Sequence, residues 1–274
     1  EDLRTVKALQ ETIQRFQTLL EVHPQVVVCD LHPKYNSTVV AEELGLPVLR
    51  VQHHYAHILS CMAENDCEEK VIGVSFDGTG YGTDGTIWGG ELLVADCQGF
   101  TRLGSIEPFV QVGGDISAKE GWRIAVSLIW QNTGNLEKTL DTVRKLGLCT
   151  DQEAKVLVTM AQRKINAVTS TSAGRLFDGV SAILGIRRAS TFEGEASTAL
   201  EFAAEAWRKQ REMQKKNPEE NLKIRMSEKE DIPESTGISE ASEDERKFIL
   251  NTGEIVAYLV RARLAGEDPG KLAY

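Results

Sequence analysis

Two short apolar runs, at residues 26–29 and 48–51, constrain the fold of this chain more than any other feature. Both are rich in β-branched residues and are bounded by turn residues, which is typical of buried strands. Between them, residues 38–44 have the composition of a helix that ends at Gly45. The pattern predicts a β-α-β unit. The parallel strands of such a unit end at one edge of the sheet, where ligands bind in open α/β folds.

Polar side chains follow both predicted strands. Asp30 comes directly after the first strand, while His53 and His57 follow the second at the start of a helical segment. On a helix these two histidines lie on one face, with Cβ atoms roughly 5–6 Å apart, and two neutral imidazoles so placed can bind one divalent ion. A hydrogen-bonded histidine pair with a purely structural role has the same spacing. His54 points away from that face, so we expect it to have a supporting or structural role.

A glycine-rich segment from Asp77 to Gly85 follows the next predicted strand, at residues 71–76. Further strands are expected at 86–94 and 100–106, and the short turns between the three strands predict an antiparallel meander. Glycines let backbone N–H groups approach an anion closely, and Asp77 at a strand end can bind a metal ion. The G-x-G-x-G spacing matches neither the dinucleotide fingerprint nor the phosphate loop, and an ordinary hairpin turn would have the same pattern.

The remainder of the chain, from residue 115 onward, has helical periodicity over 119–131, about 136–147 and 151–167. We assign the apolar residues of these three helices to the core: Trp122, Ile124, Ala125, Leu128, Ile129, Leu140, Val143, Leu146, Val156, Leu157, Met160 and Ile165. Residues 2–22 predict an amphipathic helix that also packs on the core. Residues 215–247 contain few apolar groups, which predicts a weakly structured insertion.

A hydroxyl-rich stretch at 170–172 leads into an apolar helix that carries Arg175 and Asp178 three residues apart. One interpretation is a local ion pair, which contributes little to stability at a surface. The other is that both side chains face a nucleotide, with Asp178 accepting hydrogen bonds from ribose hydroxyls. The spacing is compatible with both interpretations.

Composition narrows the classes of partner. The net charge of −10 argues against a broad nucleic-acid interface, which needs clustered Lys and Arg. The five cysteines are dispersed without CxxC spacing, which disfavours a disulfide framework or a thiolate zinc site and fits a reducing cytoplasm. No apolar run approaches the length of a membrane span. We therefore expect small molecules and proteins as partners, with no nucleic acid and no membrane.

Four motifs stand out across the whole chain: HHYAH at 53–57, FDGTGYGTDGTIWGGE at 76–91, GRLFDGV at 174–180 and EGEA at 193–196. Together they resemble the HypF carbamoyltransferase family. The resemblance covers most of the chain, including DLHP at 30–33 and GWR at 121–123, and weakens only across 208–250. It implies an α/β fold of the actin-like ATPase superfold in two lobes, with residues 1–69 ending the first lobe and 70–274 forming the second.

The resemblance also implies a function. A carbamoyl group would pass from carbamoyl-adenylate, made from carbamoyl phosphate and ATP by a separate YrdC-like domain, to the C-terminal cysteine thiolate of a HypE-like partner. This transfer supplies the cyanide ligand during NiFe-hydrogenase maturation in the cytoplasm. By motif position, the ligands of a zinc or iron ion would be His53, His57 and Asp77. The nucleotide would lie near Gly78, Thr79, Gly80, Gly82, Gly174, Arg175 and Asp178, and no residue of this chain is assigned a catalytic role.

The family's domain ordinarily contains further parts: a strand before Glu1, and a glycine-rich segment and an acidic metal ligand after Tyr274. We therefore expect an incomplete domain, which alone neither makes carbamoyl-adenylate nor transfers carbamoyl efficiently. Two alternative functions remain. One is a related carbamoyl or threonylcarbamoyl transferase that acts on a hydroxyl, an amine or a tRNA base. The other is a non-catalytic nucleotide- and metal-binding module used for protein docking.

Overall fold

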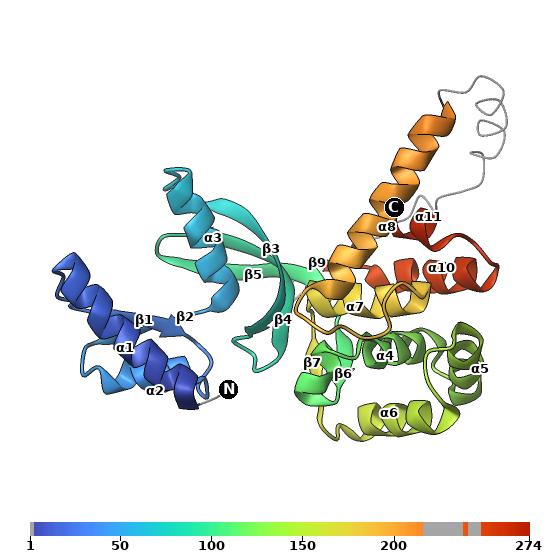
Figure 1. The fold of residues 1–274 in the computed structure, drawn as a ribbon, viewed down its shortest axis with the longest axis horizontal. Helices are drawn as coiled ribbons and strands as arrows, with labels where there is room; N and C mark the ends of the chain where they lie inside the picture. Colours follow the sequence, from blue (N-terminus) through green and yellow to red (C-terminus); the bar gives the residue numbers. More distant parts are fainter. Residues whose placement is uncertain (1–2, 216–237, 241–247) are drawn as a thin grey trace.

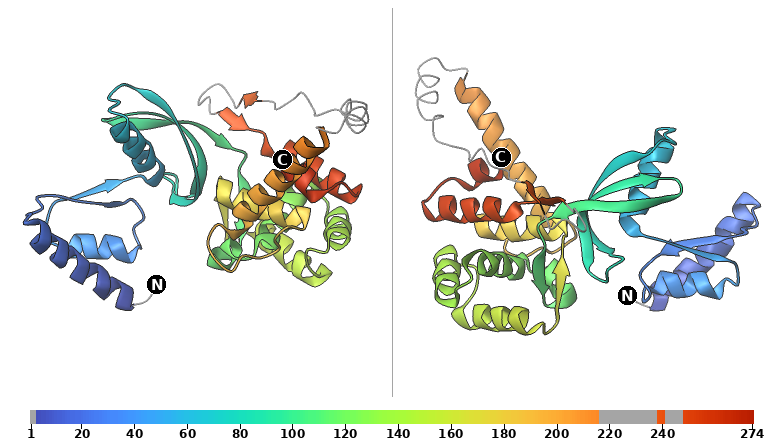
Figure 2. Two further views of the ribbon diagram at one scale, coloured as in Figure 1. Left: turned by 45° about the horizontal axis from the view of Figure 1, so that its top comes forward. Right: turned by 180° about the vertical axis from the view of Figure 1, so that it is seen from behind.

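The computed structural model describes residues 3–215, 238–240 and 248–274 (Figure 1). The predicted weakly structured insertion at 215–247 falls almost wholly outside these residues; within it the structure describes Lys215 and the strand β8 (Ile238–Glu240), which pairs with β9 (Phe248–Leu250). The molecule is elongated (Figures 1 and 2). The helices and strands of residues 3–51 lie at one end, the helices that follow residue 120 lie at the other, and a twisted sheet lies between them.

The predicted β-α-β unit is confirmed. Strands β1 (Val27–Asp30) and β2 (Val48–Val51) pair in parallel around α2 (Asn36–Glu43), with Asp30 opposite Val51. Helix α3 (His53–Glu64) begins two residues after β2 ends. Because the register brings the ends of both strands level, Asp30 lies beside the start of α3.

The first helix, α1 (Leu3–Leu20), differs from its prediction as a core helix. It has no buried residue, and Leu3 and Leu19 are 85% and 69% exposed. Among the described residues it packs mainly against α2, through contacts such as the one between Gln10 and Glu43. Its apolar stripe is present in the sequence, but none of its side chains is buried.

The antiparallel meander is also confirmed, as β3 (Val71–Tyr81), β4 (Ile87–Asp96) and β5 (Gly99–Ile106). The first strand is longer than predicted, because β3 continues through half of the glycine-rich segment. The pairing of β3 with β4 shifts register between Phe76 and Gly80, which is a bulge. The turn itself is short: Gly82 N–H donates to the Thr86 carbonyl, and Gly85 has φ +76°.

The sequence pattern did not indicate four short strands, β6 (Phe109–Val112), β7 (Ala167–Ser170), β8 and β9. They extend the meander into a seven-stranded sheet of order β6-β7-β4-β5-β9-β8, with β3 on β4. The predicted helix at 151–167 ends earlier than expected, because its last predicted residue, Ala167, belongs to β7. Lys164 adopts left-handed φ +53°, which stops the helix at Arg163 and frees the next residues to form β7. Runs of three or four residues carry little periodicity, and the pattern that indicated β1 and β2 did not indicate these strands.

Helices pack beside this sheet. Their bounds are α4 (Gly121–Thr133), α5 (Leu136–Leu146), α6 (Asp151–Arg163), α7 (Ala173–Leu184), α8 (Glu195–Lys215), α10 (Thr252–Leu264) and α11 (Pro269–Ala273). Most predicted core residues are buried there, with Ile124, Ile129 and Val143 at 1% exposure or less. The assignment was wrong for Val156 and Ile165, which are 45% and 51% exposed.

Helix α3 packs on the meander. Its residues Ile58 and Met62 share a buried cluster with Trp88, Leu93 and Ala95. The approach is so close that a Cβ at Gly73 would lie 2.3 Å from Ile58 Cδ1. The predicted division into lobes after residue 69 stays a prediction, but α3 itself is joined to β3 and β4 by this packing.

A buried ion pair connects the strands around Trp88. Glu91 is fully buried, and its Oε2 lies 2.7 Å from Arg102 Nε. Arg102 also contacts Asp84 at 3.2 Å and stacks 4.1 Å above the Trp88 ring. The second oxygen of Glu91 accepts a hydrogen bond from Thr171, which follows β7. The glycine turn, β4, β5 and β7 are therefore held at one point.

We expect Arg102→Ala to destabilise the protein by about 3 kcal/mol, because it leaves the Glu91 carboxylate buried without its counter-ion. For a chain of this size that corresponds to a fall of roughly 6–12 °C in Tm, measured by thermal unfolding. The control is Lys70→Ala, which breaks the solvent-exposed pair with Asp96 (3.6 Å) and should leave the Tm almost unchanged. Equal losses in the two variants would contradict this account of the buried pair.

Candidate functional site

The start of α3 is set by Gln52. Its side-chain oxygen accepts a hydrogen bond from Tyr55 N–H and so caps the helix, while its Nε2 donates to the Tyr81 carbonyl at the end of β3. Both contacts come from a residue that is 4% exposed. The first turn of α3 is thereby fixed against β3, and His53, the first residue of the helix, lies beside Asp77.

His53 lies between two carboxylates. Its Nδ1 is 2.9 Å from Asp30 Oδ2, and its Nε2 is 2.9 Å from Asp77 Oδ2. His57, one turn further along α3, places its Nε2 3.2 Å from His53 Nε2 and 3.8 Å from Asp77 Oδ2. The structure therefore brings together all three predicted metal-ligand residues, whose ligand atoms lie within 4.8 Å of one another.

These contacts change the acid–base properties of the cluster. The hydrogen bond to Asp77, together with that to Asp30, raises the pKa of His53 to about 9 against the cost of burial. The same contact with His53 lowers the pKa of Asp77 to about 2, helped by the Gly78 N–H. Without an ion, His53 is therefore a protonated bridge between two carboxylates. An ion bound at His53 Nε2 would displace that proton.

The geometry fits a divalent cation. Ligand atoms bonded about 2.1 Å from one ion lie roughly 3–3.5 Å from each other. The distances among His53, His57 and Asp77 are 2.9, 3.2 and 3.8 Å, so small side-chain shifts would bring all three onto one ion. Two imidazoles and one carboxylate suit zinc or iron. The side chain of His57 is 56% exposed, so an ion here would keep open positions toward solvent. Binding of the ion itself stays a proposal.

His54 lies outside this cluster. It is fully buried, with its ring 6.3 Å from that of Trp88. Because the Gln52 amide nitrogen can only donate, the contact at 3.1 Å makes His54 Nδ1 an acceptor and places the proton on Nε2, which has no hydrogen-bond partner among the described residues. Burial lowers the pKa of His54 to about 4. The ring is thus neutral at physiological pH and packs beneath the cluster.

The glycines predicted to lie near the nucleotide are closely packed against neighbouring residues. A Cβ at Gly80 would lie 2.4 Å from His54 Cε1, and one at Gly82 would lie 2.3 Å from Trp88 Nε1. A Cβ at Gly174 would lie 2.9 Å from Gly78 Cα. Packing therefore accounts for Gly80, Gly82 and Gly174 without any ligand. Thr79 is exposed, and its hydroxyl donates to the Gly78 carbonyl.

Gly78 also places the cluster beside the first turn of α7. Ser172 caps this helix by accepting from Arg175 N–H, and its hydroxyl contacts the Gly78 carbonyl at 2.6 Å. Free N–H groups at a helix start attract anions. Asp77 and the beginning of α7 are therefore neighbours, although they are far apart in the sequence.

Arg175 and Asp178 form the local ion pair that the sequence allowed, with Arg175 Nε 2.7 Å from Asp178 Oδ2. Asp178 is 4% exposed, and burial raises the pKa of its carboxyl, opposed by Arg175. The guanidinium extends toward Gly78: a Cβ there would lie 3.9 Å from Arg175 Nη2. A nucleotide contact of either residue stays a proposal.

Two cavities lie near the cluster of His53, His57 and Asp77, and a third lies away from it. One of about 360 Å³ borders His57 and continues between α3 and β3 to Cys67. A larger one, of about 850 Å³ and mostly apolar, lies among α7, α8 and α10 and reaches Phe76 and Ala173, the neighbours of Asp77 and Gly174 in the chain.

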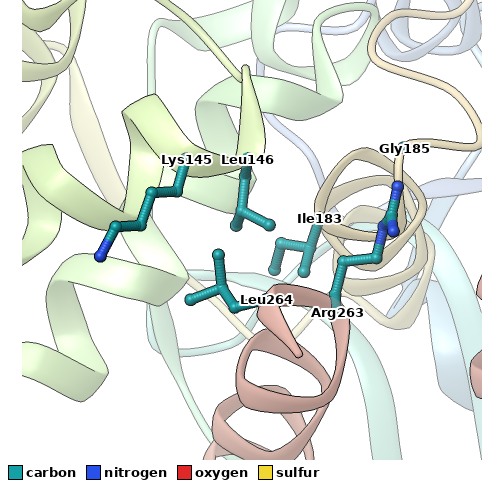
Figure 3. Close-up of a pocket in the computed structure, with 6 residues that line it drawn as sticks. All are labelled: Lys145, Leu146, Ile183, Gly185, Arg263 and Leu264. Atoms are coloured by element: carbon teal, nitrogen blue, oxygen red, sulfur yellow. The ribbon is translucent and has the colours of Figure 1, made fainter. Parts of the chain in front are cut away.

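The third cavity, of about 450 Å³, lies between the ends of α5, α7 and α10 (Figure 3). It is far from the histidines, since α3 lies beside the sheet, away from the part of the helical body that contains α5 and α10 (Figures 1 and 2). Its cations are engaged elsewhere: Lys145 pairs with Asp141, and Arg263 donates to the Leu184 carbonyl. The cavity therefore belongs to the helical packing and not to the site.

We expect Gly80→Ala to cost about 1–3 kcal/mol in a thermal unfolding experiment, because the new methyl group overlaps the His54 ring, which is buried and held by Gln52. Gly99→Ala is the matched control, since Gly99 lies in β5 with nothing within 4 Å of an added Cβ. The two glycines share a strand conformation that alanine tolerates. A Tm for Gly80→Ala equal to that of the control would rule out the close contact.

Comparison with known proteins identifies the family. The model described as "HypF Kae1-like domain" matches residues 1–64, and that described as "Carbamoyltransferase, Kae1-like Domain, second subdomain" matches residues 73–274. The chain is 40% identical over 182 residues to a probable carbamoyltransferase HypF of Methanocaldococcus jannaschii, covering 65% of this chain and 24% of that protein. It is 39% identical over 210 residues to carbamoyltransferase HypF2 of Cupriavidus necator, covering 75% and 25%.

Solved structures agree. A full-length HypF in a phosphate- and nucleotide-bound form matches with a TM-score of 0.75 and 31% identity, over 96% of this chain and 30% of that one. The HypF of T. kodakarensis matches with a TM-score of 0.76 and 26% identity, over 100% and 33%. The fold is thus the α/β, Kae1-like ATPase class that the motifs implied. This chain belongs to the HypF carbamoyltransferase family and spans about a quarter of the length of the two curated relatives.

Sequence reasoning located the three clustered residues but missed two supporting features. Asp30 was placed at the correct sheet edge, yet its contact with His53 was not predicted; the parallel register of β1 and β2 was the available signal. The ion pair between Glu91 and Arg102 could not be predicted from residue spacing, because the pairing of β4 with β5 shifts register between these residues. None of the helices in the described residues combines the length and apolar character needed to cross a bilayer.

Proposed function

We propose that this chain contributes the carbamoyl-transfer site of a HypF-type enzyme, which moves a carbamoyl group from carbamoyl-adenylate to the C-terminal cysteine thiolate of a HypE-like protein. The observation that carries the proposal is the convergence of His53, His57 and Asp77 beside the first turn of α7, in a chain of this family. The transfer would serve cyanide-ligand synthesis for NiFe hydrogenases. It would take place in the cytoplasm, where a thiolate acceptor stays reduced.

The transfer is a substitution at the carbamoyl carbon. The thiolate sulfur attacks that carbon, a C–S bond forms, and the C–O bond to the adenylate phosphate breaks, so that AMP leaves with the electron pair. Negative charge grows on the carbamoyl oxygen and on the departing phosphate. A zinc or iron ion held by His53, His57 and Asp77 would supply Lewis-acid stabilisation of this charge.

The residues of the chain have distinct parts in this scheme. The free N–H groups at the start of α7 would face the phosphate. Arg175, held by Asp178 and directed toward Gly78, would add positive charge at the same place. The acceptor brings the nucleophile, so the chain needs no catalytic cysteine. The open position beside His57, bordered by the smaller cavity, would admit the thiolate.

The metal assignment predicts a clear result. The wild-type protein should bind about one equivalent of zinc or iron, measured by elemental analysis after dialysis. His53→Ala, His57→Ala and Asp77→Ala should each retain much less. His23→Ala is a suitable control, because His23 belongs to the loop before β1 and contributes nothing to the cluster. Equal metal content in all of these proteins would remove the ligand assignment.

The transfer itself can be measured by mass spectrometry as the gain of one carbamoyl group on the C-terminal cysteine of the acceptor, with carbamoyl phosphate and ATP supplied. We expect the intact polypeptide that carries this chain to perform the transfer and His57→Ala to lose most of it. The 274-residue chain alone should show little turnover. Efficient transfer by the chain alone, or by the His57 variant, would contradict the proposal.

A further inference from the structure

We propose that Asp30 is a positioning residue: its carboxylate holds the His53 imidazole so that Nε2 faces the metal-ligand cluster. This inference rests on the proposed function, because it assigns the residue that orients one ligand of the proposed ion. The cluster of metal-ligand atoms comprises His53, His57 and Asp77 and does not include Asp30. Asp30 contacts Nδ1 of the His53 ring, whereas the cluster faces Nε2.

The carboxylate of Asp30 is itself fixed in place. Asp30 is the last residue of β1, and its Oδ1 accepts the His32 N–H at 2.8 Å. This leaves Oδ2 for His53 Nδ1, at 2.9 Å. The side chain is 16% exposed, so both contacts are largely shielded from solvent. Oδ1 and Oδ2 therefore have different partners, the backbone at His32 and the ring of His53.

The chemistry of the contact determines which nitrogen can bind an ion. Without an ion, both ring nitrogens face carboxylates, which only accept hydrogen bonds, and both are protonated. When an ion replaces the proton on Nε2, the contact with Asp30 keeps the remaining proton on Nδ1. Nε2 then carries the lone pair, and Nε2 is the atom that faces His57 and Asp77. A carboxylate on the far nitrogen also raises the basicity of a histidine ligand and fixes its ring plane. Asp30 therefore selects both the tautomer and the direction of the ligand.

The position of Asp30 depends on packing between segments. The turn after β1 is held against β3 by His32, whose ring stacks on Tyr35 at 4.0 Å and meets the Tyr81 ring edge-on at 5.0 Å. Gln52 ties the Tyr81 carbonyl to the start of α3. The three residues Asp30, His53 and Asp77 come from β1, α3 and β3, so the proper ligand geometry requires all three elements to be in place.

A structural role must be distinguished from positioning, because Asp30 also orders the turn at His32. Thr38 provides a matched control for that turn. It is fully buried, and its hydroxyl donates to the His32 carbonyl at 3.0 Å without contacting His53. Thr38→Val keeps the shape of the side chain and removes that hydrogen bond. A loss of turn order would therefore appear in both the Thr38 and the Asp30 variants.

The test measures the affinity of the intact polypeptide for Co²⁺ and Zn²⁺ by competition with a chromogenic chelator, and the visible absorption of bound Co²⁺. We expect Asp30→Ala to weaken both metals about 10- to 100-fold and to alter the Co²⁺ spectrum. Asp30→Asn, which keeps an acceptor for the His32 N–H, covers the case in which the alanine variant does not fold, and should weaken binding less. Thr38→Val should bind both ions as the wild type does.

Three outcomes would overturn the inference. Unchanged affinity in both Asp30 variants, with metal lost from His53→Ala, would remove the role of Asp30 and leave the metal site standing. Equal weakening in the Asp30 and Thr38 variants would assign the effect to the turn. Wild-type protein that binds neither ion would overturn the metal site and, with it, the role of Asp30.

Discussion

The contact of one imidazole with two carboxylates is the constraint on which the site depends. His53 lies between Asp30 at the end of β1 and Asp77 in β3, and it is the first residue of α3. Strands β1 and β3 and helix α3 must therefore all contact the His53 ring. The parallel register of β1 and β2 places Asp30 beside the ring. The Gln52 cap and the packing of α3 on the meander place His53 beside Asp77.

Close packing explains why the surrounding motif is rich in glycine. Gly73 lets α3 approach β3, and Gly80 makes room for His54 beneath the cluster. The contact of Gly174 with Gly78 brings the first turn of α7 beside Asp77. A short motif with several glycines thus does not need a bound phosphate to account for its composition. Its glycines let α3, β3 and the start of α7 approach one another more closely than larger residues would allow.

The elements with a clear apolar pattern were predictable, including the four-residue strands β1 and β2, and the remaining short strands were not. The β-α-β unit, the three strands of the meander and the helices between residues 121 and 163 follow from local pattern. Strands β6, β7, β8 and β9 have three or four residues each and were missed. The error at α1 has another cause, because its apolar stripe was read correctly but its burial depends on a neighbour that the described chain does not provide.

The sequence by itself determined two things. The spacing of His53 and His57 placed them on one helix face, and the order of strands, helices and glycine motif indicated the class of fold. The sequence also carried the family resemblance, which the comparisons confirmed. Only the tertiary structure decided that Asp30 contacts His53, that His54 is buried and neutral, and that Arg102 neutralises Glu91. Local spacing governs helix faces and strand alternation, whereas contacts between distant segments depend on sheet register and side-chain packing.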